Sequence, residues 1–171
     1  MIHRRCRCAG MFLALWLTVA AQPALAEGDP PFVSVGIGYY DINDNEDAAE
    51  FRVEYRSNKR LWVFNPFGGV MVSSDAAVYA YGGIMLDLFF GRRWVLTPNF
   101  AAGLYTDGSG KDLGHTIEFR SALNLAYRFD NRARLGLSFY HISNASLADN
   151  NPGTEVLTVL YSIPLNFDLG G

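Results

Sequence analysis

Cysteine and histidine are both scarce in this chain of 171 residues. The two cysteines, Cys6 and Cys8, lie within the first 26 residues, so the remaining 145 residues have no disulfide to stabilise them and no thiolate to bind zinc. Beyond residue 26 the histidines are His115 and His141. No group of histidine, cysteine and acidic residues has the spacing of metal ligands. We therefore expect neither a metal nor a cofactor.

An excess of basic residues is also lacking. After residue 26, 11 Lys and Arg stand against 17 Asp and Glu, a formal net charge of −6. Such a chain is a poor partner for the phosphate backbone, and we expect no nucleic-acid binding. Long apolar runs are missing from the same region, which excludes a transmembrane helix there. The length suits a single domain.

The first 26 residues have the three-part layout of a secretory signal peptide. A basic start, MIHRRCRC, precedes the apolar run MFLALWLTVAA, and Ala24-Leu25-Ala26 forms a small-residue cleavage site. The apolar run is too short to span a bilayer as a helix. We expect export, cleavage near Ala26/Glu27, and one domain over residues 27–171.

Apolar and polar residues alternate through most of the exported chain. In the stretch 115–129, HTIEFRSALNLAYRF, one parity is mainly apolar and the other carries the charged residues. The stretch 48–56, AAEFRVEYR, repeats this pattern. A period of two is typical of β-strands with two different faces. No segment shows a sustained helical period, so we predict an all-β fold.

Turn signals divide residues 27–171 into eight such segments. They are 32–41, 48–56, 61–73, 77–90, 94–105, 115–129, 133–144 and 154–167. Short connections (SNKR, GRR, DNR) alternate with longer polar ones (INDNED, TDGSGKDLG, ASLADNNPG), and only the short SDA breaks this order. Eight strands fit either a soluble sandwich or lipocalin-like barrel, or a barrel of the bacterial outer membrane.

Three features favour the membrane barrel. The segments are long for soluble strands but suit a tilted bilayer span. Short and long connections alternate, as in outer-membrane barrels. Aromatic residues also gather near segment ends, as interfacial girdles do. These aromatic residues are Tyr39, Tyr40, Trp62, Phe64, Phe89, Phe90, Trp94, Tyr105, Phe129 and Tyr140. We predict an eight-stranded antiparallel transmembrane β-barrel whose odd-to-even connections face outward from the cell.

The charged parity of this barrel would face the interior. There we expect a compensated charge network in a filled barrel, because buried charges persist only when they are paired. Its members would be Glu50, Arg52, Glu54, Glu118, Arg120 and Arg128.

Three polar residues interrupt the apolar parity of the last two segments, in the stretch YHISNASLADNNPGTEV. On a lipid-facing wall His141, Ser143 and Glu155 would be costly unless paired. If the hairpin is symmetric about residue 148, His141 lies opposite Glu155, with Ser143 about 7 Å along the strand. Serine, histidine and carboxylate in this order form a nucleophile, a base and an orienting acid. The alternative is an ordinary interfacial histidine, a capping serine and a turn glutamate. His115 lacks comparable partners and is interpreted as structural.

The motif HISNA, then NPG, then Glu155 fourteen residues after His141 resembles the C-terminal signature of the lipid A 3-O-deacylase (PagL) family of Gram-negative outer membranes. The resemblance implies an eight-stranded barrel with a Ser-His-Glu triad on its lipid-facing surface. Ser143 would be the nucleophile, His141 the base and Glu155 the orienting acid, and Asn144 resembles the family's oxyanion-hole residue. Ser146 departs from the glycine that family members often carry.

The activity that this resemblance implies is hydrolysis of the ester-linked acyl chain at the 3-position of lipid A (lipopolysaccharide) in the outer leaflet. The product would be a 3-hydroxy fatty acid. Two alternatives stay open: another outer-membrane lipid acyl hydrolase or transferase, such as a phospholipase or palmitoyl transferase, and a non-catalytic structural or adhesive barrel. The sequence also leaves open the acyl-chain preference and whether the barrel forms a homodimer.

Overall fold

The computed structural model describes residues 29–44 and 47–165. The predicted signal peptide, residues 1–26, lies outside the described residues and stays a prediction. The strands are β1 (Phe32–Tyr40), β2 (Ala48–Arg56), β3 (Asn65–Ser73), β4 (Val78–Met85), β5 (Leu88–Phe90), β6 (Trp94–Thr106), β7 (Ile117–Arg128), β8 (Arg134–Ser143) and β9 (Thr154–Pro164). No helix in this part of the chain is long and apolar enough to cross a membrane.

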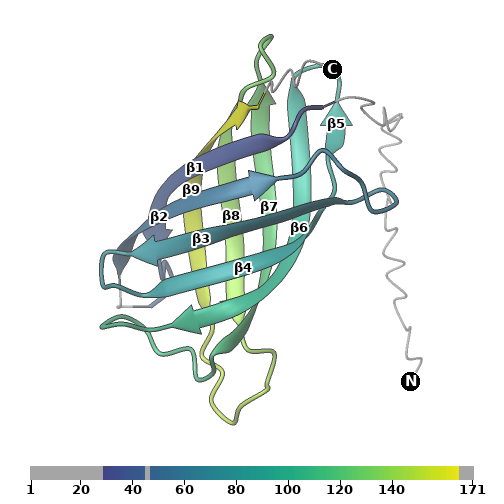
Figure 1. The fold of residues 1–171 in the computed structure, drawn as a ribbon. Helices are drawn as coiled ribbons and strands as arrows, with labels where there is room; N and C mark the ends of the chain where they lie inside the picture. Colours follow the sequence, from purple (N-terminus) through teal and green to yellow (C-terminus); the bar gives the residue numbers. More distant parts are fainter. Residues whose placement is uncertain (1–28, 45–46, 166–171) are drawn as a thin grey trace, which may run out of the picture.

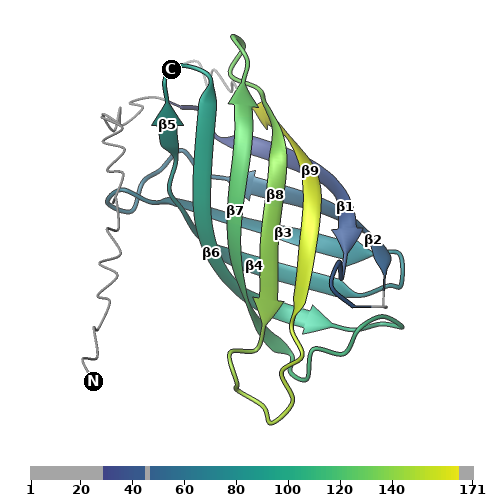
Figure 2. The ribbon, with the colours of Figure 1, turned by 180° about the vertical axis from the view of Figure 1, so that it is seen from behind.

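These strands form one closed antiparallel sheet. Neighbours in sequence pair around the barrel, and the first strand, β1, pairs with the last, β9. Strands β4 and β5 share a single register against β6, from Val78 opposite Thr106 to Phe90 opposite Trp94, and so fill one place in the ring. Figure 1 shows β1–β4 on the near side, and Figure 2 shows β6–β9 on the opposite side. The predicted eight-stranded antiparallel barrel is confirmed.

A proline explains why the predicted segment 77–90 is interrupted at residues 86–87. The Leu86 N–H donates to the Pro98 carbonyl oxygen at 3.1 Å. Pro98 has no N–H with which to return this bond, so the ladder between these neighbours is incomplete. The chain leaves regular strand geometry there, and Asp87 lies in the interruption.

The direction of the side chains separates the two architectures that the sequence left open. In β2, Glu50, Arg52 and Glu54 are at most 3% exposed, whereas Phe51 and Val53 are 52% and 56% exposed. The interior therefore holds charged residues, together with buried apolar ones such as Phe67 and Met71, and the outer wall is apolar. A soluble barrel has the reverse arrangement, so the exposed apolar wall favours the membrane barrel.

Aromatic residues at the strand ends divide between the two faces, which corrects part of the predicted girdle. Trp62 and Trp94 are exposed, as a girdle requires, but Tyr40, Tyr105 and Tyr140 are buried inside the barrel. Their hydroxyl groups explain this placement, because each has a polar partner in the interior. Tyr40 and Tyr105 hydroxyl oxygens lie 3.0 Å apart, and the Tyr140 hydroxyl donates to a Glu50 carboxylate oxygen at 2.9 Å.

In the part of the chain that the structure describes, four of the six predicted members of the interior charge network form ion pairs with one another, whereas Glu118 and Arg128 do not. Arg128 lies 3.3 Å from Asp29 instead. Arg52 lies 3.6 Å from the Glu50 carboxylate, and Arg120 lies 3.7 Å from that of Glu54. The Arg120 guanidinium also stacks over the Tyr140 ring. Glu118 was expected in this network, yet within the described residues neither of its carboxylate oxygens has a hydrogen-bond partner.

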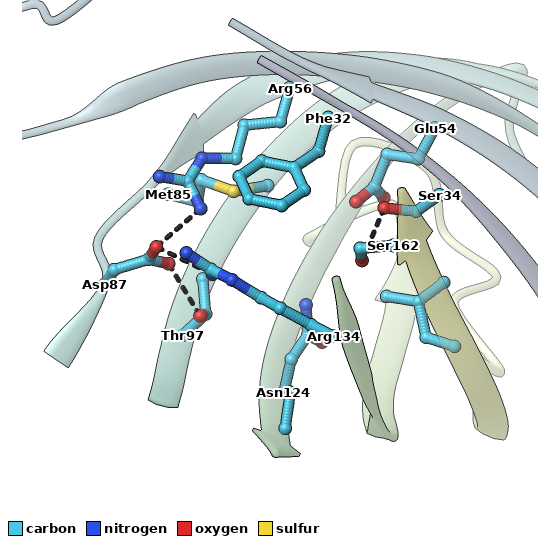
Figure 3. Close-up of a pocket in the computed structure, with 12 residues that line it drawn as sticks. Phe32, Ser34, Glu54, Arg56, Met85, Asp87, Thr97, Asn124, Arg134 and Ser162 are labelled. Atoms are coloured by element: carbon cyan, nitrogen blue, oxygen red, sulfur yellow. Dashed lines mark hydrogen bonds and ion pairs between the residues drawn. The ribbon is translucent and has the colours of Figure 1, made fainter. Parts of the chain in front are cut away.

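We call the end that carries connections 57–64, 91–93 and 129–133 the turn end. Figure 3 shows a cluster inside it, where Asp87 accepts hydrogen bonds from Arg56 and Thr97 and lies 2.8 Å from an Arg134 nitrogen. Arg134 also pairs with Asp29 at 2.6 Å. The cavity beside this cluster holds only about 40 Å³. The turn end is thus filled by paired charges.

Candidate active site

The hairpin of β8 and β9 presents the candidate site at the opposite end, which carries connections 41–47, 74–77, 107–116 and 144–153 and is called the loop end. His141 of β8 and Glu155 of β9 are direct register partners, as a hairpin symmetric about residue 148 predicts. The His141 Nδ1 and Glu155 Oε1 atoms lie 2.9 Å apart. The side chains are 44% and 27% exposed, so the pair is accessible from the outer wall.

The hydrogen bond to Glu155 sets the tautomer of His141. A carboxylate can only accept, so Nδ1 must donate its proton to Oε1. In neutral His141, Nε2 is then the unprotonated nitrogen, which is the one able to accept a proton from a nucleophile. The β8–β9 pair alone therefore provides a base together with its orienting acid.

Ser143 is the last residue of β8 and the next outward position after His141. It is half-buried, between Phe119 of β7 on one side and the end of the hairpin on the other. No hydrogen bond joins Ser143 to His141 within the described residues. Catalytic hydrogen bonds are often long or misaligned until the reacting complex forms. Because Ser143 lies two residues from His141 on the same face of the strand, its hydroxyl group and the imidazole remain neighbours.

A tight turn follows Ser143. Ala145 and Ser146 have φ of 52° and 64°, and the Leu147 N–H donates to the Asn144 carbonyl oxygen at 3.0 Å. Two successive left-handed residues favour glycine, which accounts physically for the glycine expected at position 146. Ser146 adopts the same backbone conformation without it. Within the described residues the Ala145 and Ser146 N–H groups have no hydrogen-bond partner, so both are available as donors.

Asn144 is fully buried and joins two loops. Its Nδ2 group donates to the Leu113 carbonyl oxygen at 2.9 Å and to the Asn150 carbonyl oxygen at 2.8 Å. Its backbone N–H donates to Asn151 Oδ1. The side chain faces the interior, like those of Tyr140 and Ile142 on β8. Its donors are occupied in holding the connections 107–116 and 144–153 together.

Asn43 is a neighbour of Glu155 that sequence reasoning missed. Its Nδ2 group donates to Glu155 Oε2 at 2.9 Å, and the Ile42 N–H donates to the Glu155 carbonyl oxygen at 3.1 Å. The two residues are 112 positions apart in the chain, and the pairing of β1 with β9 brings them together. No local pattern marks Asn43, which sits in an ordinary polar turn, so only the closed barrel reveals it.

Lys111 of the connection 107–116 fixes the turn that contains Asn43. Its Nζ atom lies 2.6 Å from Asp41 Oδ1 and also contacts Asp44, on either side of Asn43. Burial acts to lower the pKa of Lys111, but the hydrogen bonds to Asp41 and Asp44 outweigh it and raise the pKa above its ordinary value. The ammonium group therefore stays charged at neutral pH, and it closes the loop end of the barrel.

His115, the other histidine in the part of the chain that the structure describes, is held by the backbone two residues further along. The Ile117 N–H donates to His115 Nδ1 at 2.9 Å, in a shallow polar cleft that Asp107 and Asp112 also line. No serine lines this cleft with it. The structural role expected for His115 stays a prediction.

The fold and site define a class before they define a family. The barrel is closed and eight-stranded, with charged residues inside and an apolar outer wall. A paired histidine and glutamate lie next to a serine on that wall, so the class is an outer-membrane barrel with a candidate hydrolase site. The chain belongs to the lipid A 3-O-deacylase (PagL) family, whose model matches residues 47–164.

Individual relatives agree with this membership. The chain is 25% identical over 80 residues to the lipid A deacylase PagL of Bordetella bronchiseptica, a match that covers 46% of this chain and 45% of that protein. The chain thus spans less than half the length of that relative.

Solved structures support the fold. The crystal structure of the outer membrane enzyme PagL superposes with a TM-score of 0.62 at 17% identity, covering 78% of this chain and 99% of that one. Neisserial surface protein A superposes with a TM-score of 0.55 at 12% identity, covering 81% and 100%. Family and barrel fold together support a location in the outer membrane.

Proposed function

We propose that this chain is a lipid A 3-O-deacylase that hydrolyses the ester-linked acyl chain at the 3-position of lipid A. Ser143 is the nucleophile, His141 the base and Glu155 the orienting acid. The observation that carries the proposal is the 2.9 Å contact between His141 Nδ1 and Glu155 Oε1 on the apolar outer wall, with Ser143 two residues further along β8. Family membership supplies the substrate class.

The reaction follows from the orientation of the imidazole. The Ser143 hydroxyl oxygen attacks the ester carbonyl carbon while its proton passes to His141 Nε2. Glu155 stabilises the resulting imidazolium through Nδ1. His141 then returns the proton to the departing sugar hydroxyl, which leaves an acyl-Ser143 ester. Water, activated by the same imidazole, attacks this ester and releases the 3-hydroxy fatty acid.

The negative charge that develops on the ester oxygen needs hydrogen-bond donors near Ser143. Asn144 is the residue that the family resemblance proposes for this role. Because its Nδ2 group is bonded to two carbonyl oxygens, we propose that Asn144 acts by fixing the turn. The N–H groups of Ala145 and Ser146, on that turn, then serve as the donors.

The position of the site on the wall suits a substrate that never leaves the membrane. Phe139 and Leu157 are exposed apolar residues on the same face, two residues from His141 on β8 and from Glu155 on β9. An acyl chain can lie against this wall while its ester group, near the polar boundary, meets Ser143. Release of the product into the surrounding lipid then requires no tunnel.

Substitution of the three residues tests the proposal. We expect Ser143→Ala and His141→Ala each to lower kcat by at least about 1,000-fold, because members of a triad act as one unit. Glu155→Ala should cost less, since the orienting acid is usually the most dispensable member. The measurement is release of 3-hydroxy fatty acid from purified lipid A in detergent.

Ser121→Ala is the matched control. Ser121 is exposed on the same wall and is the register partner of His141 on β7, so it is the other serine that the imidazole could activate. We expect this variant to keep its activity. Loss of activity in Ser121→Ala with retention in Ser143→Ala would transfer the nucleophile to Ser121. Full activity in both would show that neither serine is the nucleophile and would reject the proposed triad, whereas no release by the unmodified protein would favour a non-catalytic barrel.

A further inference from the structure

We infer that Asn43 is a positioning residue for the Glu155 carboxylate and, through it, for the His141 imidazole. The inference rests on the proposed function of the site. Asn43 lies in the turn after β1, on the other side of β9 from His141. Within the described residues it forms no hydrogen bond with Ser143 or with the imidazole. It would act by fixing the carboxylate that orients the base.

Both oxygens of the carboxylate are engaged. Glu155 Oε1 accepts from His141 Nδ1 and Oε2 accepts from Asn43 Nδ2, each at 2.9 Å. With one oxygen bonded, a carboxylate can still rotate about its last torsion. With both bonded, its plane is fixed, and an acceptor fixed in this way holds the imidazole in one orientation.

Asn43 is itself fixed by its neighbours along the chain. Asp41 and Asp44, on either side of it, both pair with the Lys111 ammonium group. Asp41 is fully buried and also accepts a hydrogen bond from the Thr154 hydroxyl at 2.9 Å. Since Thr154 precedes Glu155 on β9, the turn is attached to the strand that carries the acid.

The chemistry of an amide suits this position. Asn43 offers a neutral N–H donor to Glu155, whereas an aspartate there would place a second carboxylate beside it. The titratable groups already in the cluster are Glu155 of β9, His141 of β8, Asp41 and Asp44 of the turn, and Lys111 of the connection 107–116. The two turn aspartates are neutralised in part by Lys111, so a new charge at position 43 would act mainly on Glu155 and His141.

The first experiment measures Asn43→Ala in the full-length protein with purified lipid A in detergent. We expect kcat to fall about tenfold with KM little changed, as expected for loss of one hydrogen bond to a charged group that does not touch the substrate. In a Glu155→Ala background the same substitution should cause no further loss, because its effect passes through Glu155.

The second experiment measures the pH profile of Asn43→Asp. The base must be neutral to act, so the acidic limb of the profile reports the protonation of His141. An added negative charge beside Glu155 stabilises the imidazolium, and the limb should move to higher pH by about half a unit or more. Asn58→Asp, in the exposed turn after β2 at the turn end, adds the same charge far from the site and should leave the profile unchanged.

The outcomes separate this inference from the proposed function. Unchanged kcat and pH profile in both Asn43 variants, with Ser143→Ala inactive, would overturn the positioning role and leave the triad intact. Equal losses from Asn43→Ala in the wild-type and Glu155→Ala backgrounds would also overturn it, since a residue that acts elsewhere gives additive effects. An active Ser143→Ala would instead reject the proposed function.

Discussion

Gly153, just before β9, sets how closely the chain can approach His141. Its φ is +66°, and a Cβ atom placed on it would lie 2.7 Å from His141 Cε1 and 3.3 Å from Nε2. Carbon atoms do not approach so closely without displacement. The glycine of the NPG sequence therefore serves the imidazole as well as the turn.

We predict that Gly153→Ala lowers kcat far more than it lowers stability. The left-handed backbone should cost about 1–2 kcal/mol of folding free energy. The imidazole must move to admit the methyl group, and a shift of about 1 Å in a catalytic group can cost about 100-fold in rate. Deacylation kinetics and thermal unfolding of the same preparations measure the two effects.

Gly91→Ala provides the matched control. Gly91 has φ of +64° with nothing within 4 Å of an added Cβ atom, and it lies at the turn end. It should show the loss of stability without the loss of kcat. Equal effects of both substitutions on kcat would attribute the result to backbone strain and remove the contact with His141 from the explanation.

The sequence predicts part of the site at the residue scale and misses the rest for a physical reason. Parity and the count of fourteen residues place His141 opposite Glu155, because a hairpin is a local structure with a regular register. Asn43 reaches Glu155 only through ring closure. Its turn has no distinguishing composition, so no pattern within the sequence connects the two residues.

At the scale of elements, the interruption between β4 and β5 places the carboxylate of Asp87 inside the turn end of the barrel. Asp87 lies beside Arg56 and Arg134 in the filled turn end, and all three side chains are at most 8% exposed. The periodicity of the segment 77–90 predicts a strand correctly but cannot show that Pro98 will be its partner. That pairing depends on the register between β4 and β6.

We predict that Asp87→Ala destabilises the barrel by about 3–5 kcal/mol, the usual cost of removing one partner from a buried ion pair. Arg56 and Arg134 would then face each other without the shared carboxylate. Denaturant unfolding in detergent measures the change, and kcat per folded molecule should stay the same because the site is at the loop end. A change below about 1 kcal/mol would mean that solvent already compensates these charges.

At the scale of the whole molecule, both ends of the barrel are closed within the described residues. Paired charges fill the turn end, and Lys111 and Leu113, both buried, close the loop end. Buried arginines and tyrosines, among them Arg52, Arg120 and Tyr140, occupy the space between the two ends. The sequence predicts this filled interior through its charged parity, although the unpaired carboxylate of Glu118 shows that parity does not assign partners.

We therefore predict that the purified protein forms no open pore. In planar bilayers it should give no stepwise conductance of the size seen in porins, because an eight-stranded barrel has room only for its own side chains. A general porin inserted under the same conditions is the positive control. Stable porin-sized steps from this protein would contradict the filled interior.

The closure of the barrel by β1 and β9 also has a consequence for how the site is assembled. His141 and Glu155 belong to one hairpin and can meet as soon as that hairpin forms. Asn43 reaches Glu155 only when β1 has paired with β9, the pairing that closes the ring. A sheet in which β1 and β9 have not yet paired would thus lack one of the contacts that position the catalytic base.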